Sequence, residues 1–127
     1  MSKHKVVHFE IPVSDFKKAK DFYGKLFGWK MEAWGQEYMT ANTTEVDKNQ
    51  RPTETGGING GFYKKKGKGQ QPSFVVETDS IDETLKAAEK AGGKVTRKKD
   101  KVGDMGFMAE FTDPDGNEIS LWEEARK

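Results

Sequence analysis

Apolar and polar positions along the chain predict one order of elements that occurs twice. Residues 5–12, KVVHFEIP, are rich in β-branched and aromatic side chains, which predicts a strand that Pro12 ends. From Asp15 onward apolar residues recur at intervals of three and four, which predicts a helix with Ser14 as its N-cap and Gly28 as its stop. Three further strands are expected, within WKMEAW, EYMTANT and GINGGFYKK.

The second half of the chain repeats this order. The stretch SFVVETDSIDETLKAAEKAGGKV predicts a strand, a helix and a glycine stop, and Ser80 with Glu83 forms an S-x-x-E capping box. A shift of 65 positions places Phe74 on Phe9 and Gly93 on Gly28. The runs KVTRKK, GFMAEFT and EISLWEE predict three more strands. We therefore expect one α+β domain over residues 1–127, built from two βαβββ modules at about 4–65 and about 73–125 that share a core.

A polar segment separates the two modules. Residues 64–72, KKKGKGQQP, carry four lysines interspersed with glycines and are interpreted as a solvated linker. A phosphate-binding loop is the alternative interpretation, but the segment lacks the helix start and the fixed glycine spacing of such loops.

Composition narrows the classes of function. The chain is 33% hydrophobic and 34% charged, and its net charge of +1 favours neither nucleic acid nor an anionic membrane as a partner. It has no cysteine, which excludes disulfides and thiolate sites and fits a reducing compartment. No apolar run is long enough for a signal peptide or a membrane span. A cytoplasmic protein is expected.

Two stretches carry a family resemblance that extends over nearly the whole chain. VVHFEIPVSDFKKAKDFYGKLFGWK at the front and DPDGNEISLWE at the back resemble the vicinal oxygen chelate superfamily, which contains glyoxalase I, bleomycin-resistance proteins and extradiol dioxygenases. The resemblance implies a curved mixed sheet around a cleft, with the helices outside, and commonly a homodimer. In the enzymes of this family the cleft holds Zn, Ni, Mn or Fe, which chelates two neighbouring oxygens of the substrate and acts as a Lewis acid.

The resemblance also implies four metal-ligand positions in this chain. They fall on His8, on about Gly61, on Ser73 and on Ser120, where the family usually has glutamate. Only His8 has a side chain suited to these metals, so we expect the metal site to be degenerate and no cofactor to be bound.

Strand alternation leaves a shifted metal site open as an alternative. Glu10 has the same parity as His8, and Glu118 has the same parity as Ser120, so His8, Glu10 and Glu118 form a possible rebuilt ligand set. Trp122 is expected either to pack in the core or to form an aromatic wall of the cleft. The expected ligand cleft contains His8, Glu10, Gly61, Ser73, Glu118, Ser120 and Trp122.

Three functions are compatible with these residues. The first is a module that binds an unidentified small, partly apolar molecule without a metal. The second is a metal-dependent lyase or dioxygenase, similar to lactoylglutathione lyase, with the shifted ligand set. The third is an interaction protein whose main role is dimerisation. No G-x-S-x-G motif and no cysteine are present, so catalytic residues are unknown and a metal or a carboxylate base would have to supply the chemistry.

Overall fold

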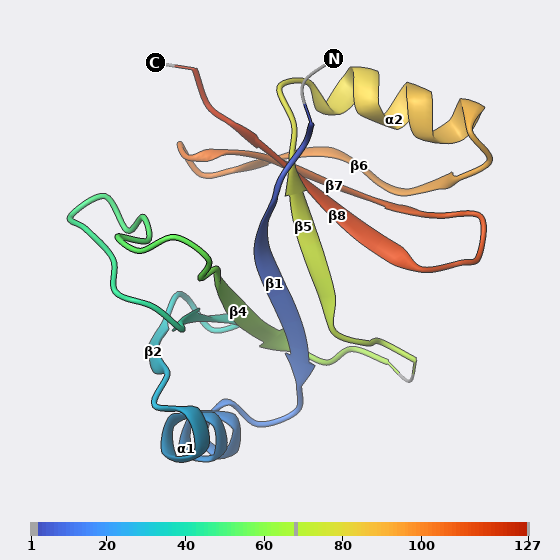
Figure 1. Cartoon of the computed structure of the whole chain (residues 1–127). Coiled ribbons are helices and arrows are strands. Elements are labelled where there is room, and N and C mark those ends of the chain that lie inside the picture. The colour runs from blue at the N-terminus through green and yellow to red at the C-terminus, as the bar shows by residue number, and fades with distance from the viewer. Residues whose placement is uncertain (1–2, 68, 127) are drawn as a thin grey trace. The chain divides into compact units, whose positions relative to one another are not determined.

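The computed structural model describes residues 3–67 and 69–126, and its elements follow the predicted order (Figure 1). Contacts divide the chain into a first half, His8–Pro72, and a second half, Met1–Val7 with Ser73–Lys127. The elements are β1 (Val6–Val13), α1 (Phe16–Phe27), β2 (Lys30–Ala33), β3 (Tyr38–Asn42), β4 (Asn59–Lys64), β5 (Ser73–Glu77), α2 (Ile81–Lys90), β6 (Lys94–Val102), β7 (Gly106–Thr112) and β8 (Glu118–Glu124).

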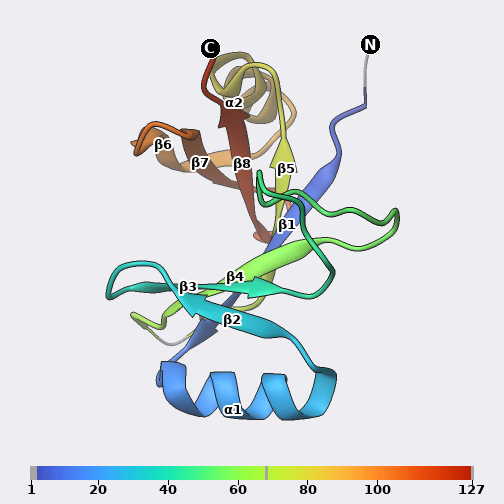
Figure 2. The ribbon, with the colours of Figure 1, turned by 90° about the vertical axis from the view of Figure 1, so that its left-hand side faces the viewer.

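The first half contains a mixed sheet with strand order β2-β3-β4-β1. The β1–β4 pair is parallel, and the β2–β3 and β3–β4 pairs are antiparallel. Helix α1 lies along one face of this sheet (Figure 2) and buries Ala19 against Met31, Met39, Ala41 and Phe62. Because side chains alternate across a strand, the helix-free face carries His8, Glu10, Tyr38, Thr40, Asn59 and Gly61.

The ends of α1 show which residues cap it. The N-cap is Asp15, whose Oδ1 accepts the backbone N–H of Lys18 at 3.0 Å, so the prediction of Ser14 was wrong by one residue. Gly28 ends the helix in the left-handed region, with φ of 74°, as the sequence predicted.

The second half has the same plan, with strand order β5-β8-β7-β6. Its β5–β8 pair is parallel, and its β7–β8 and β6–β7 pairs are antiparallel. Helix α2 buries Ile81 and Leu85 against Ala109 and Leu121. The helix-free face of this sheet carries Ser73, Val75, Glu110, Glu118, Ser120 and Trp122. The predicted pair of βαβββ modules, each a mixed sheet with its helix on one side, is confirmed.

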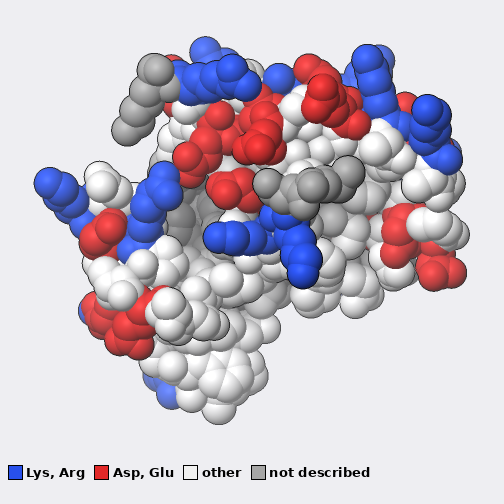
Figure 3. Space-filling model, turned by 45° about the horizontal axis from the view of Figure 1, so that its top comes forward, with Lys and Arg blue, Asp and Glu red and all other residues white. Residues whose placement is uncertain are grey.

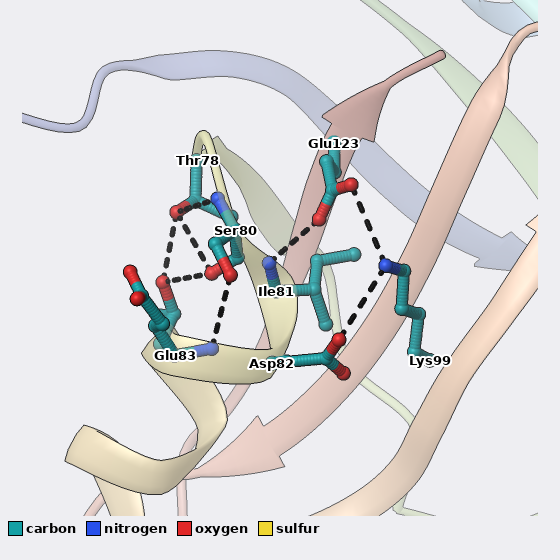
Figure 4. A network of polar contacts seen from close by, with 8 residues as sticks. Thr78, Ser80, Ile81, Asp82, Glu83, Lys99 and Glu123 are labelled. Atoms are coloured by element: carbon teal, nitrogen blue, oxygen red, sulfur yellow. Dashed lines mark hydrogen bonds and ion pairs between the residues drawn. The ribbon is translucent and has the colours of Figure 1, made fainter. Parts of the chain in front are cut away.

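The N-terminus of α2 is held by a polar network from two strands (Figure 4). The Ser80 hydroxyl accepts the Glu83 N–H at 3.2 Å, as the capping-box motif predicts. Glu123 of β8 accepts the Ile81 N–H at 2.8 Å, and Lys99 of β6 lies 3.5 Å from the same carboxylate. Lys99 also lies 3.6 Å from Asp82. The helix start is therefore tied to the sheet beneath it.

The C-terminus of α2 departs from the repeat. The left-handed residue is Gly92, with φ of 102°, and not Gly93, which the shift of 65 had aligned with Gly28. Gly93 is instead required by space, because a Cβ at this position would lie 2.7 Å from the carbonyl oxygen of Thr112.

The predicted linker begins inside a strand. Of the predicted linker 64–72, Lys64 belongs to β4, and Lys68 lies outside the described residues.

Lysine, arginine and acidic side chains gather in groups of both signs on the face drawn in Figure 3. Within the described part of the chain, no helix has the length and apolar character needed to cross a bilayer.

Candidate functional site

The helix-free face of the first half brings together three of the predicted site residues. His8 and Glu10 lie on β1, and Gly61 on β4 pairs directly with Glu10 in the parallel register. Since the core residues Phe9 and Phe62 point to α1, these three positions must face the other way. The alternation argument from sequence therefore agrees with the register in this half.

Tyr38, which sequence reasoning missed, occupies the space beside Gly61. A Cβ on Gly61 would overlap the Tyr38 hydroxyl, so only glycine fits beneath this ring. The same hydroxyl lies 2.8 Å from His8 Nε2, at hydrogen-bonding distance. The one histidine at an expected ligand position is thus hydrogen-bonded to a phenol. A glycine inside a strand pattern was the sequence signal, because it marks the close approach of another group.

Burial sets the protonation of this pair. Desolvation lowers the pKa of His8 below its usual 6.5, which favours the neutral imidazole. Desolvation, with a smaller contribution from the negative charge of Glu10, raises the pKa of Tyr38 well above 10.0. Both groups are therefore neutral near pH 7, and they share one hydrogen bond.

The helix-free face of the second half carries the other four predicted residues. Glu118, Ser120 and Trp122 alternate along β8 on this face, and Ser73 has the parity of Val75, which pairs with Ser120. Ser120 is only 2% exposed, and its hydroxyl lies 3.5 Å from Oε2 of Glu110 on β7. The short side chain of Ser120, where the resemblance led us to expect a glutamate, therefore adjoins a carboxylate on the neighbouring strand.

Glu110 is a second residue that sequence reasoning missed. Burial and the nearby Glu118 raise its pKa, and Arg97, whose Nη1 lies 4.0 Å from Oε1, opposes this rise. Its position could have been found from GFMAEFT, because Phe107, Ala109 and Phe111 alternate into the core and leave Glu110 on the other face.

The residues present do not fit a divalent metal. Gly61 has no side chain, the hydroxyls of Ser73 and Ser120 are poor ligands, and Tyr38 engages His8 Nε2. Among residues 3–67 and 69–126, no three His, Cys, Asp or Glu side chains are grouped so that they could hold a metal ion.

Comparison with solved structures shows where this fold occurs. A hypothetical protein from Bacillus halodurans is 15% identical, with a TM-score of 0.69 over 99% of this chain and 98% of that one. A methylmalonyl-CoA epimerase variant from Streptomyces coelicolor, in complex with 2-nitronate-propionyl-CoA, is 15% identical, with a TM-score of 0.67 over 98% and 100%. A superfamily member from Vibrio splendidus is 13% identical, with a TM-score of 0.61 over 96% and 100%.

Comparison with sequence families leads to a firmer conclusion. No curated protein matches the chain at a significant level. The profile of the Glyoxalase/Bleomycin resistance protein/Dioxygenase superfamily, however, matches residues 5–121, which is most of the chain. Together with the paired βαβββ halves, this match shows that the chain belongs to the glyoxalase/bleomycin resistance protein/dioxygenase superfamily.

Proposed function

We propose that the protein binds a small, partly apolar molecule on the helix-free face of its first half, without a divalent metal. The observation that carries this proposal is the hydrogen bond between His8 and Tyr38 above Gly61. Because of this hydrogen bond, the face carries a neutral, partly buried pair of polar side chains instead of a set of metal ligands. The epimerase with a similar fold was determined with a small molecule bound, which supports a role in binding for the superfamily fold.

If the protein were instead a metal-dependent lyase or dioxygenase, His8 would have to bind a metal ion. A lyase or dioxygenase with ligands at His8, Glu10 and Glu118 needs His8 Nε2 or Nδ1 as a donor to the metal. Breaking the Tyr38 hydrogen bond to use Nε2 would leave the partly buried phenol without this partner, which is unfavourable.

A titration with metals separates the two functions. After dialysis against EDTA, calorimetry with Zn²⁺, Ni²⁺ and Mn²⁺ should show no tight stoichiometric binding at pH 7. A fragment screen on the same metal-free protein, monitored by amide NMR, should find compounds that shift resonances around His8 and Tyr38. One equivalent of metal bound with submicromolar affinity and lost in His8→Ala would overturn the proposal. Metal-dependent turnover of the methylglyoxal–glutathione hemithioacetal would overturn it as well.

The proposal includes a homodimer in the cytoplasm. Its support is an exposed apolar strip on α1, where Phe22 is 60% and Leu26 is 58% exposed. Lys18, Asp21 and Lys25 line an open depression with these two side chains. The absence of cysteine supports a reducing compartment. Light scattering should give the mass of a dimer, and Phe22→Lys with Leu26→Lys should give that of a monomer.

A further inference from the structure

The amide of Asn59 is satisfied on one side only. Its Oδ1 accepts the backbone N–H groups of Thr43 and Thr44, at 2.8 and 3.2 Å. Its Nδ2 is buried and has no hydrogen-bond partner among the described residues. Because two N–H donors fix which atom is the oxygen, the amide cannot turn around to resolve this. A buried donor without a partner is costly, so this NH₂ group calls for an explanation.

The unsatisfied amide belongs to the same face as the His8–Tyr38 pair. Asn59 stands directly opposite His8 in the parallel register of β1 and β4. Neighbouring strands lie about 4.8 Å apart, so the two residues are adjacent on the helix-free face of the first half.

A count of protons shows what the pair itself can offer. A neutral imidazole and a neutral phenol have one donor proton each, and the 2.8 Å contact uses one of the two. If Tyr38 donates to Nε2, the remaining proton is on His8 Nδ1. If Nε2 donates, the remaining proton is on the Tyr38 hydroxyl. With either tautomer the pair retains one donor, and Asn59 adds a second kind of donor beside it.

Charge and neighbouring rings restrict the group that these donors would bind. The His8–Tyr38 pair is neutral, so it offers a carboxylate or a phosphate no opposite charge to pair with. Trp34, which is 52% exposed, has its ring 6.2 Å from that of Tyr38 at an interplanar angle of 78°. It offers an apolar surface next to the polar groups.

We propose that Asn59 Nδ2 and the His8–Tyr38 pair together bind the acceptor oxygen of an uncharged carbonyl group, as in an aldehyde, ketone, ester or amide whose apolar part lies against Trp34. The inference rests on the proposed function and names the chemistry of its ligand. The oxygen is recognised by hydrogen bonds alone, and the apolar ring contributes contact area.

Three probes of similar shape test this chemistry. Acetophenone has a neutral acceptor oxygen, ethylbenzene has none, and benzoate has a charged one. Each is titrated into ¹⁵N-labelled protein, and side-chain and backbone N–H resonances are followed. Acetophenone should shift the Asn59 NH₂ pair saturably, together with backbone signals of β1, β3 and β4. Ethylbenzene and benzoate should bind there about tenfold more weakly or not at all.

A matched pair of variants isolates the donor. Asn59→Asp keeps an oxygen for the Thr43 and Thr44 N–H groups, so the loop anchor is retained while the NH₂ is lost. Asn49→Asp makes the same charge change on an exposed turn of the same half. Asn59→Asp should weaken acetophenone binding about tenfold, and Asn49→Asp should leave it unchanged. The spectrum of each variant reports whether it is folded.

The outcomes distinguish this inference from the proposed function. If ethylbenzene shifts the same resonances as acetophenone, or if Asn59→Asp binds acetophenone like the parent, the inference is wrong while binding on this face stands. Absence of any shift with acetophenone overturns the inference too. The proposed function is then judged by the metal titration and the fragment screen, which do not depend on Asn59.

Discussion

Gly61 is the position at which β4 leaves room for the Tyr38 ring. Gly61→Ala adds a Cβ where the Tyr38 hydroxyl lies, so the ring must move and its hydrogen bond to His8 is lost. We expect the free energy of unfolding in urea to fall by about 1–3 kcal/mol. The imidazole signals of His8 should shift in the NMR spectrum at the same time.

Gly67→Ala is the control for this substitution. A Cβ on Gly67 would meet no atom within 4 Å, so its stability should change by less than about 0.5 kcal/mol. If Gly61→Ala were as stable as Gly67→Ala and left the His8 signals unchanged, the close approach of Tyr38 to β4 would be wrong.

The alternation of side chains along a strand predicts which face of the sheet a residue lies on, but it does not predict which residues of other strands lie beside it. His8 and Glu10 share one face because side chains alternate along a strand, and the sequence is enough for that step. The sequence does not contain the diagonal contact from Tyr38 on β3 to Gly61 on β4, because it depends on which strands pair and in which register. The sheet face of Glu110 could be predicted from GFMAEFT, but its place beside Ser120 depends on the register of β7 and β8.

At the level of the elements, helix α1 has two adjacent residues that could each cap its N-terminus. Ser14 and Asp15 are both good N-cap types, so composition could not separate them. In the structure the Asp15 carboxylate accepts the Lys18 N–H. Asp15→Ala should therefore lower the free energy of unfolding measurably, whereas Ser14→Ala should be nearly neutral. Thermal unfolding followed by circular dichroism measures both; equal losses would contradict the assignment of Asp15.

Helix α2 depends on a cap from outside its own segment. Glu123 of β8 accepts the Ile81 N–H and also pairs with Lys99, in a largely buried position. Glu123→Ala should cost about 1–3 kcal/mol, because it leaves the N–H and the ammonium without this partner. Asp82→Ala removes an exposed carboxylate near the same Lys99 and should cost less than half as much in urea unfolding. A reversed order would show that Asp82 is the more important partner.

Local motifs explain why the elements were predictable and where their ends were not. Ser80 as N-cap of α2 and Gly28 as the end of α1 are encoded within a few residues, and both hold, although the Ser80 N–H donates to the Thr78 hydroxyl. Gly92 and Gly93 are adjacent and either could take the left-handed turn, so the sequence alone could not show that Gly92 takes it while Gly93 packs against Thr112. The cap from Glu123 comes from 42 residues away, so no local pattern contains it.

For the whole molecule, the repeat of βαβββ is what made the fold predictable. Helices α1 and α2 begin at Phe16 and Ile81, which are related by the predicted shift of 65. In each module an apolar sheet face lies against the helix, and the alternation that places it there is visible in the sequence. The shift relates the order of elements in the two halves, but it does not predict which side chains lie beside one another on a sheet face.

The neutral His8–Tyr38 pair also predicts how the stability of the molecule depends on pH. The pKa of His8 is lowered in the fold, so its contribution to stability is fully present above the unfolded value of 6.5 and is lost as pH falls below it. The pKa of Tyr38 is raised, so its contribution is present below 10.0 and is lost as pH rises above that value. The free energy of unfolding should therefore fall on both sides of this window.

Two substitutions test whether the losses of stability at low and at high pH come from His8 and Tyr38. His8→Gln retains a hydrogen-bonding group for the Tyr38 hydroxyl but does not titrate, so it should flatten the acid side below about pH 6.5. Tyr38→Phe should flatten the alkaline side above about pH 10. Other groups, including Glu110 with its raised pKa, are common to parent and variant and cancel in the difference. Urea unfolding across this pH range gives the slopes.

If His8→Gln kept the acid slope of the parent, His8 would not be held in its neutral form by burial. The proton count on which the binding of a carbonyl oxygen rests would then have to be revised.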